Sequence, residues 1–273
     1  MTKFSLIQLN TGCEPKKSFK VLKKYITEAA YSGSKFICTP ETTNIMEVRN
    51  SLLFKKIYTE KEDIYLKKIL GLAKDLKIWI NLGSWILKDD KNKAVNRTIL
   101  VNPEGLIHAR YDKIHLFDVE ISEKEKYLES KTYNSGNKAV VTKTPFGSLG
   151  LSICYDLRFP YLYRDLATNG AEIIFVPSAF TYETGKVHWH SLLTARAIET
   201  GSYVIAAAQK GIHENKRRTF GHSLVIDPWG KIIAEKKSGI GLMDFDIDLK
   251  RVKNARSKIP SIYANKKYKI LRN

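Results

Sequence analysis

The chain has 273 residues, of which 43% are hydrophobic and 27% charged, and its formal net charge is +18. This composition excludes intrinsic disorder, collagen and a small disulfide scaffold, and the length allows one or two domains. No apolar run reaches the roughly 20 residues that cross a bilayer. Residues 1–10 lack the apolar block of a signal peptide, so we expect a cytoplasmic protein.

Short apolar segments and amphipathic segments follow one another along the whole chain. In the first half, strands are predicted at residues 4–9, 35–39, 78–85, 96–101 and 106–111, and helices at 16–32 and 60–75. In the second half, strands are predicted at residues 139–144, 149–154, 173–176, 203–209, 222–226, 231–235 and 243–247, and helices at 159–169 and 187–199. Turns with Pro and Gly join three pairs of adjacent strands, which is typical of hairpins.

The two halves of the chain resemble each other. Val101-Asn-Pro-Glu-Gly105 matches Ile226-Asp-Pro-Trp-Gly230, and Phe36-Ile-Cys-Thr-Pro40 resembles Ile173-Ile-Phe-Val-Pro177. Both matches are short, and chance is the alternative explanation. A real duplication would stack two sheets between layers of helices. No linker rich in Gly, Ser or Pro divides the chain, so we predict a single folded domain.

Cysteine usage points to single thiols. The three cysteines are odd in number and form no CxxC pair, which fits neither a disulfide framework nor a zinc ribbon. Cys154 ends an apolar strand and precedes a helix, and such a turn exposes a side chain where backbone N–H groups stabilise a thiolate or an oxyanion. The alternative is a small buried hydrophobe. Cys13 and Cys38 lack this turn and are assigned to structure.

A nucleophilic cysteine needs a base, and the sequence offers two kinds. His188 and His190 lie two apart, so on a helix they point to different faces and indicate no metal pair, but a Cys–His hydrolase stays open. Glu41 follows a buried strand, where desolvation is expected to raise its pKa and let it accept a thiol proton. Lys113 follows another strand and is either a fixed cation for an oxyanion or one of many surface lysines.

Three motifs resemble the nitrilase, or carbon–nitrogen hydrolase, superfamily in order and spacing. They are Thr39-Pro-Glu41, Tyr111-Asp-Lys-Ile-His-Leu-Phe-Asp118 and Ser152-Ile-Cys-Tyr-Asp-Leu-Arg-Phe-Pro160. The resemblance runs from about Phe4 to Asp248. It implies an α/β fold, an α-β-β-α four-layer sandwich that is internally pseudo-duplicated.

The same resemblance implies roles for site residues. Glu41 is the implied base, Lys113 the cation at the oxyanion and Cys154 the nucleophile that forms a thioester. Glu129 matches a second glutamate, which orients the lysine and the substrate, and the Tyr155 N–H matches a second oxyanion donor. The resemblance implies no metal and no organic cofactor.

A later segment resembles deaminated glutathione amidases, through Ala207-Ala-Gln-Lys-Gly-Ile-His213 and Gly221-His-Ser-Leu-Val-Ile-Asp-Pro-Trp-Gly230. This implies cleavage of deaminated glutathione to 2-oxoglutarate and cysteinylglycine. Because the substrate has two carboxylates, a substrate-binding cluster is expected at His213, Lys216, Arg217 and Arg218; a solvated loop is the alternative. An omega-amidase acting on 2-oxoglutaramate or 2-oxosuccinamate is the alternative function.

The positive charge leaves a second class of function open. A basic nucleic-acid-binding protein is the distant alternative, but only 11 of the 46 basic residues are Arg, the residue that reads bases and phosphates best. Nine basic residues and no acidic one lie in residues 249–273. We therefore predict a hydrolase domain over residues 1–248 and a basic tail over 249–273. The expected partners are a small anionic amide and further copies of the chain in a homodimer or larger homo-oligomer, with no nucleic acid and no membrane.

Overall fold

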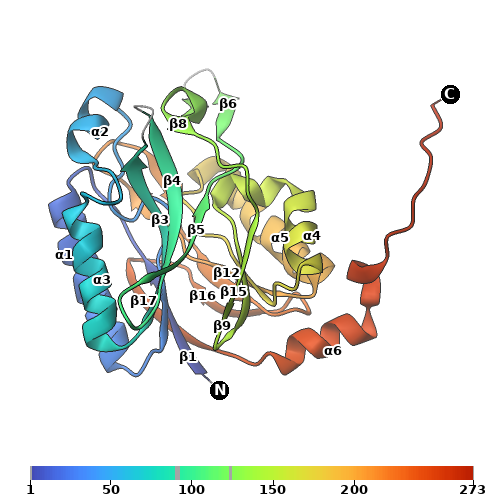
Figure 1. Ribbon diagram of the computed structural model, residues 1–273. Helices are drawn as coiled ribbons and strands as arrows, with labels where there is room; N and C mark the ends of the chain where they lie inside the picture. The colour runs from blue at the N-terminus through green and yellow to red at the C-terminus, as the bar shows by residue number, and fades with distance from the viewer. Residues whose placement is uncertain (1, 90–92, 123–124, 273) are drawn as a thin grey trace.

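The computed structural model describes residues 2–89, 93–122 and 125–272, and its core is a pair of stacked β-sheets (Figure 1). The first sheet has the order β17-β1-β2-β3-β4-β5, with β8 paired to β4, and the second has the order β16-β15-β12-β11-β10-β9. The strands of the first sheet are β1 (Thr2–Gln8), β2 (Phe36–Cys38), β3 (Trp79–Lys88), β4 (Ala94–Val101), β5 (Ile107–Asp112), β8 (Tyr133–Asn134) and β17 (Gly241–Ile247). Those of the second are β9 (Val140–Thr144), β10 (Gly147–Leu151), β11 (Ile173–Phe175), β12 (Tyr203–Ala206), β15 (Ser223–Ile226) and β16 (Ile232–Lys236).

Helices cover the outer face of each sheet. Figure 1 shows α1 (Pro15–Tyr31) and α3 (Ile64–Leu76) on one side of the strands and α4 (Pro160–Thr168) and α5 (Tyr182–Thr200) on the other. The order of layers is therefore helix, sheet, sheet, helix, which confirms the predicted α-β-β-α sandwich. Between the sheets the rings of Phe36 and Phe175 stack 5.6 Å apart, one from each sheet.

The strand order confirms the duplication that the two short sequence matches indicated. In each sheet, three central parallel strands are flanked by an antiparallel strand on one edge and an antiparallel hairpin on the other. The hairpins are β4–β5 and β15–β16, and each turns at one of the matching Asn/Asp-Pro-x-Gly segments. Gly105 and Gly230 have φ values of 74° and 86°, a backbone region that favours glycine.

Several short elements are absent from the sequence-based prediction. These are α2 (Asn50–Lys56), the 3₁₀ turn η1 (Glu129–Lys131), and two hairpins, β6 (Asp118–Ser122) with β7 (Glu125–Leu128) and β13 (Lys210–Ile212) with β14 (Arg218–Phe220). They are short and mostly polar, so they lack the apolar periodicity on which the prediction depends. All of them lie near one end of the sandwich, where they form loops around the candidate site.

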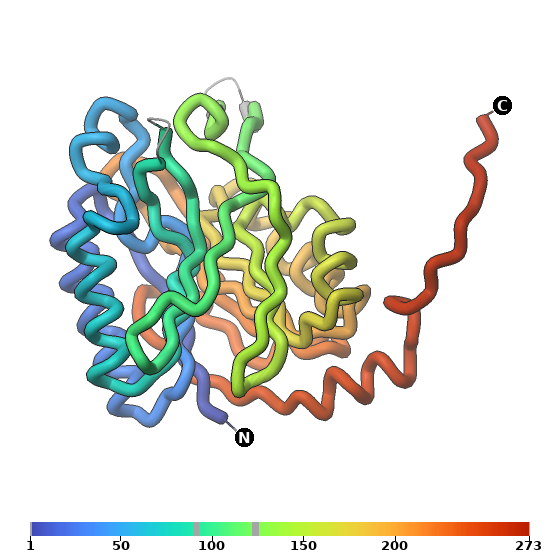
Figure 2. The backbone as a smooth tube through the Cα atoms, viewed as in Figure 1, coloured from blue at the N-terminus to red at the C-terminus, as the bar shows by residue number. Residues whose placement is uncertain are grey.

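The segment assigned to a basic tail begins with a docked helix, α6 (Lys250–Lys258). Its Val252 is buried, and Arg256 donates hydrogen bonds to the carbonyl oxygens of Ala171 at 2.6 Å and Thr200 at 3.2 Å. Basic residues here therefore hold the helix on the second sheet's helical layer, which charge counting does not reveal. After η3 (Pro260–Tyr263) the chain runs away from the body (Figure 2). The domain boundary at residue 248 stays a prediction.

Within the described ranges, we find no helix whose length and apolar character suit it to cross a membrane.

Candidate active site

Cys154 occupies a sharp turn at the end of β10. Its φ of 46° is unusual for a residue with a side chain, and the turn continues as the 3₁₀ helix η2 (Cys154–Arg158). The buried Asp156 carboxylate fixes this turn, because it accepts hydrogen bonds from the Ile153 N–H at 2.8 Å, the His115 N–H at 3.0 Å and the Tyr111 hydroxyl at 2.7 Å. The Cys154 side chain is thereby held at the edge of the sheet.

Glu41 reaches the same place from the first sheet, three residues after β2. Its Oε1 accepts hydrogen bonds from Lys113 Nζ at 2.9 Å and from Asn96 Nδ2 at 2.9 Å, and its Oε2 accepts one from the Ala179 N–H at 2.8 Å. The carboxylate also lies close enough to the Cys154 thiol for each group to shift the pKa of the other. Three donors, two from the first sheet's side and one from the second's, therefore hold this buried carboxylate near the thiol.

Lys113 follows β5 and lies between two carboxylates. Its Nζ is 2.9 Å from Glu41 Oε1 and 2.9 Å from Glu129 Oε2, and its side chain is 2% exposed. The Phe117 N–H donates to Glu129 Oε2 at 2.6 Å, which holds that glutamate in place. The structure thus brings together Glu41, Lys113, Glu129 and Cys154, from four separate places in the sequence.

The electrostatics of the cluster correct one expectation from the sequence. Burial alone would raise the pKa of Glu41, but the charge and hydrogen bond of Lys113 outweigh it, so this pKa lies below its usual value. The expected raised pKa of Glu41 is therefore wrong. Burial and the Glu41 charge raise the pKa of the Cys154 thiol well above its usual value, despite the helix turn that follows. The resting pair is a carboxylate beside a neutral thiol.

A cavity of about 460 Å³ opens onto these groups. Its lining includes Tyr155, which lies in the first turn of η2, where backbone N–H groups lack partners within the helix. Among the described residues, four further cationic side chains line it: Lys126, Arg158, Lys216 and Arg217. A cavity of this size suits a small molecule, and its excess of cations suits an anionic one.

The four basic residues expected to bind substrate separate into two pairs. Lys216 and Arg217 line the cavity, in the turn between β13 and β14. His213 is buried away from it, with Nδ1 2.9 Å from the Thr11 carbonyl oxygen, and burial lowers its pKa to about 4. Arg218 lies outside the lining, because its guanidinium stacks 3.3 Å from the centre of the Tyr182 ring. A neutral His213 and a stacked Arg218 are not placed to bind a carboxylate in this cavity.

Arg217 is the cation best placed to receive a ligand. Its Nη2 donates to the Ala179 carbonyl oxygen at 2.7 Å, and its guanidinium lies 5.1 Å from the centre of the Tyr127 ring. Its Nε is buried and has no hydrogen-bond partner in the part of the chain that the structure describes. A buried donor without a partner costs free energy, so this atom favours an acceptor brought by a bound molecule.

Sequence reasoning missed Asn96, which joins the two glutamates. Its Nδ2 is 2.9 Å from Glu41 Oε1 and 3.3 Å from Glu129 Oε1. A weak signal was present, because Asn96 is one of three consecutive polar residues, with Arg97 and Thr98, in strand β4. The backbone donors Ala179 N and Phe117 N gave no such signal, since any residue type supplies an N–H.

The chain is similar to known proteins over most of its length. A family model described as carbon–nitrogen hydrolase matches residues 3–257. The deaminated glutathione amidase of Dictyostelium discoideum is 39% identical to this chain, over 99% of the chain and 96% of that protein. The one from Yersinia enterocolitica is 36% identical, over 96% and 92%. The crystal structure of Saccharomyces cerevisiae Nit3, a member of branch 10 of the nitrilase superfamily, has a TM-score of 0.84 at 29% identity, over 95% of this chain and 94% of that one.

Proposed function

This chain belongs to the carbon–nitrogen hydrolase family, and we propose that it hydrolyses deaminated glutathione to 2-oxoglutarate and cysteinylglycine through a thioester on Cys154. It is a hydrolase of carbon–nitrogen bonds, and its relatives support an amidase. One observation carries the proposed mechanism: Glu41 and Lys113 are hydrogen-bonded to each other beside the Cys154 thiol, in a cavity lined with cations.

The first half of the reaction follows from the resting protonation states. Because the thiol is neutral and Glu41 is ionised, Glu41 takes the proton as the sulfur attacks the amide carbon. The carbonyl oxygen becomes negative, and Lys113 Nζ and the Tyr155 N–H stabilise it. The carbon–nitrogen bond then breaks, the amine takes the proton from Glu41, and the acyl group stays on sulfur as a thioester.

The second half repeats the same proton transfers with water. Glu41 takes a proton from a water molecule as its oxygen attacks the thioester carbon. Lys113 and the Tyr155 N–H again stabilise the oxyanion. The carbon–sulfur bond breaks, sulfur recovers the proton from Glu41, and the carboxylic acid leaves. Throughout, Glu129 keeps the Lys113 ammonium facing the site through its 2.9 Å contact.

We assign a different cation of the cavity to each of the two carboxylates of the proposed substrate. The unpartnered Arg217 Nε lies close to the catalytic groups, since the same guanidinium contacts the Ala179 carbonyl and acts on the charge of Glu41. We assign it to the carboxylate of the 2-oxo acid, which deaminated glutathione and 2-oxoglutaramate share. Lys216 is exposed at the rim of the cavity and is assigned to the distal carboxylate, which only deaminated glutathione has.

The catalytic roles are tested by substitution. Cys154→Ala is expected to abolish turnover with the fold intact, while Cys13→Ala is the matched control that keeps activity. Glu41→Gln preserves shape and should slow acylation by about 10²–10⁴-fold. Lys113→Ala should lower kcat by at least about 10²-fold. Circular dichroism checks folding, and turnover within threefold of wild type in any folded site variant contradicts its assigned role.

The substrate is tested by comparing kcat/KM for the two amides. Charge-assisted hydrogen bonds contribute about 1.5–3 kcal/mol, so Arg217→Ala should lower kcat/KM about 10–150-fold for both substrates. Lys216→Ala should lower it for deaminated glutathione alone, by a smaller factor because the side chain is exposed. Arg218→Ala, adjacent in sequence but outside the cavity, is the matched control. A wild-type preference for 2-oxoglutaramate would favour the omega-amidase alternative, with the catalytic residues unchanged.

A further inference from the structure

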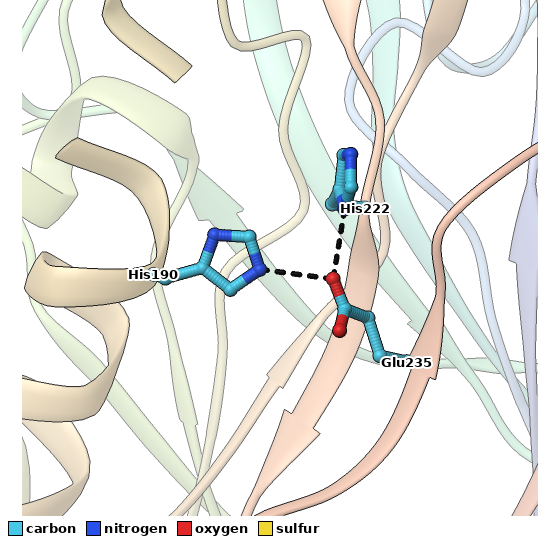
Figure 3. Close-up of side chains that lie close together, drawn as sticks. All are labelled: His190, His222 and Glu235. Atoms are coloured by element: carbon cyan, nitrogen blue, oxygen red, sulfur yellow. Dashed lines mark hydrogen bonds and ion pairs between the residues drawn. The ribbon is translucent and has the colours of Figure 1, made fainter. Parts of the chain in front are cut away.

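A second cluster of reactive side chains lies outside the catalytic cavity. His190 on α5, His222 immediately before β15 and Glu235 on β16 converge, as Figure 3 shows. His190 Nε2 is 2.9 Å and His222 Nδ1 is 2.8 Å from the same atom, Glu235 Oε1. Among the described residues, this is the group of three His, Cys, Asp or Glu side chains whose ligand atoms all lie within 4.8 Å of one another.

We propose that His190, His222 and Glu235 bind a divalent transition-metal ion of the zinc type. Two imidazole nitrogens and one carboxylate oxygen are a common protein ligand set for zinc, with water as the fourth ligand. Ligand atoms on a tetrahedral zinc ion are about 3.3 Å apart, given metal–ligand distances of about 2.0–2.2 Å. The two nitrogen–oxygen separations of 2.9 and 2.8 Å therefore need to widen by about half an ångström, and the two imidazole nitrogens already lie within 4.8 Å of each other.

The backbone and an aromatic ring hold His222 in position. His222 has a φ of 55°, and the preceding Gly221 has a φ of 76°, so two consecutive residues adopt a left-handed conformation to turn this imidazole toward α5. The Phe220 ring stacks 4.3 Å from the His222 ring, and Trp189 Nε1 donates to the His222 carbonyl oxygen at 2.8 Å. A ligand held in advance loses less conformational entropy when it binds a metal.

The cluster is accessible to solvent, and a neighbouring lysine does not block it. The side chains of His190, His222 and Glu235 are 37%, 22% and 13% exposed, so an ion and its water can enter from solvent. Lys237 is the nearby competitor, but its Nζ is 4.0 Å from the other carboxylate oxygen, Glu235 Oε2, and its side chain is largely exposed. It can swing into solvent when an ion binds at Oε1.

The site's expected effect is structural. None of the three residues lines the catalytic cavity, so the ion takes no part in the hydrolysis proposed above. It would join α5 to the β15–β16 hairpin. His222 and Glu235 lie 32 and 45 residues after His190 in the sequence. An ion that binds only the folded chain raises its thermal stability.

The test uses the untagged full-length chain with Cys154→Ala, because the active-site thiol is a competing zinc ligand. Titration calorimetry with zinc chloride is expected to give one ion per chain, with a rise in Tm. His190→Ala, His222→Ala and Glu235→Gln should each weaken binding by at least about tenfold, since even outer-shell partners of metal sites change affinity by about 10–100-fold. His188→Ala, an exposed imidazole on the same helix, is the matched control.

Two other metal ions test the type of site. Cobalt in place of zinc should give the intense visible absorption of a four-coordinate ion, and this band should disappear in His222→Ala. Magnesium should not bind, because it prefers an octahedral shell of oxygen ligands. Absence of zinc binding, equal affinity in folded His190→Ala and His222→Ala, or a weakened His188→Ala control would overturn the proposal.

Discussion

At the scale of single residues, the identity of the base decides the acid side of the pH profile. Lys113 holds the pKa of Glu41 below its ordinary value of 4.5, so Glu41 stays ionised, and able to accept a proton, to lower pH than a free glutamate. We predict that the acid limb of kcat/KM for the wild type lies below about pH 4.5. A histidine base would place it near the ordinary histidine pKa of about 6.5. Initial rates measured from pH 4 to 8 separate the two cases.

Acid also destabilises folded proteins, so the folded state of the enzyme is checked at each pH. Circular dichroism at each pH identifies the range in which the enzyme stays folded. A loss of kcat/KM centred near pH 6.5 in folded enzyme would remove Glu41 as the base.

His213 makes a separate contribution to the pH dependence of stability. Burial lowers its pKa to about 4, whereas in the unfolded chain it has the ordinary value of 6.5. As pH falls below 6.5, the unfolded chain binds a proton that folded His213 refuses, so stability is complete above pH 6.5 and is lost toward pH 4. The difference in pKa corresponds to about 3 kcal/mol. Urea unfolding at pH 7.5 and pH 4.5 measures this loss.

Comparing variants separates the contribution of His213 to the acid loss of stability from the contributions of other titrating groups. His213→Gln is expected to lower stability at pH 7.5, because it loses contacts with Thr11 and Thr219, but to lose less of what remains on acidification. His108→Gln, at an exposed histidine, should follow the wild type. Equal acid losses in wild type and His213→Gln would show that His213 does not cause the effect.

Among the elements, the three motifs predicted which side chains would lie together at the candidate site, and periodicity predicted the long helices and strands. The helix predicted at residues 16–32 is α1 (Pro15–Tyr31), because its apolar residues recur at helical spacing. The β13–β14 hairpin was missed, and with it the reason why four basic neighbours separate. A hairpin turn sends His213 inward, Arg217 into the cavity and Arg218 onto a tyrosine, which sequence adjacency cannot reveal.

The two sheets approach each other closely at Gly83, on β3, near the loops that carry Glu41 and Ala179. A Cβ atom there would lie 1.9 Å from the Thr39 carbonyl oxygen and 2.5 Å from Pro177 Cβ. These residues lead to Glu41 in the first sheet and to Ala179 in the second. We predict that Gly83→Ala destabilises the protein by about 3 kcal/mol, the upper end of the usual cost of overpacking, and lowers activity.

The matched control for this prediction is another glycine. Gly71 lies inside α3, and a Cβ there would meet no atom within 4 Å. Gly71→Ala should therefore stabilise the protein by up to about 1 kcal/mol, because alanine favours the helix. Urea unfolding curves of both variants give the comparison. A Gly83→Ala protein as stable and as active as wild type would show that the two loops do not depend on this contact.

Over the whole molecule, the positively charged and the exposed apolar side chains suit different partners. The cations that face the cavity suit an anionic substrate, while other basic residues, such as Arg251 with Asp227 at 2.8 Å, dock α6. Beyond η3 the chain carries exposed Tyr268, Ile270 and Leu271 on a segment that leaves the body (Figure 2). Exposed apolar residues on such a segment favour burial against a partner surface.

The sequence predicts a homo-oligomer, so we expect this segment to pack against a second copy of the chain. Ile198, Trp229 and Ile259 are each more than half exposed and line one hollow between α5, the β15–β16 turn and α6. We predict a homodimer in which the apolar residues of each C-terminal segment contact the other copy.

Light scattering should then give twice the chain mass of 31.2 kDa. Tyr268, Ile270 and Leu271 changed together to Ser should shift the protein toward monomer, because the apolar area no longer leaves water on association. Changing Lys266, Lys267 and Lys269 to Ser in the same segment is the matched control, expected to leave the dimer in place. A wild-type monomer, or dissociation caused only by the lysine changes, would contradict an apolar contact and point to charge as the main attraction.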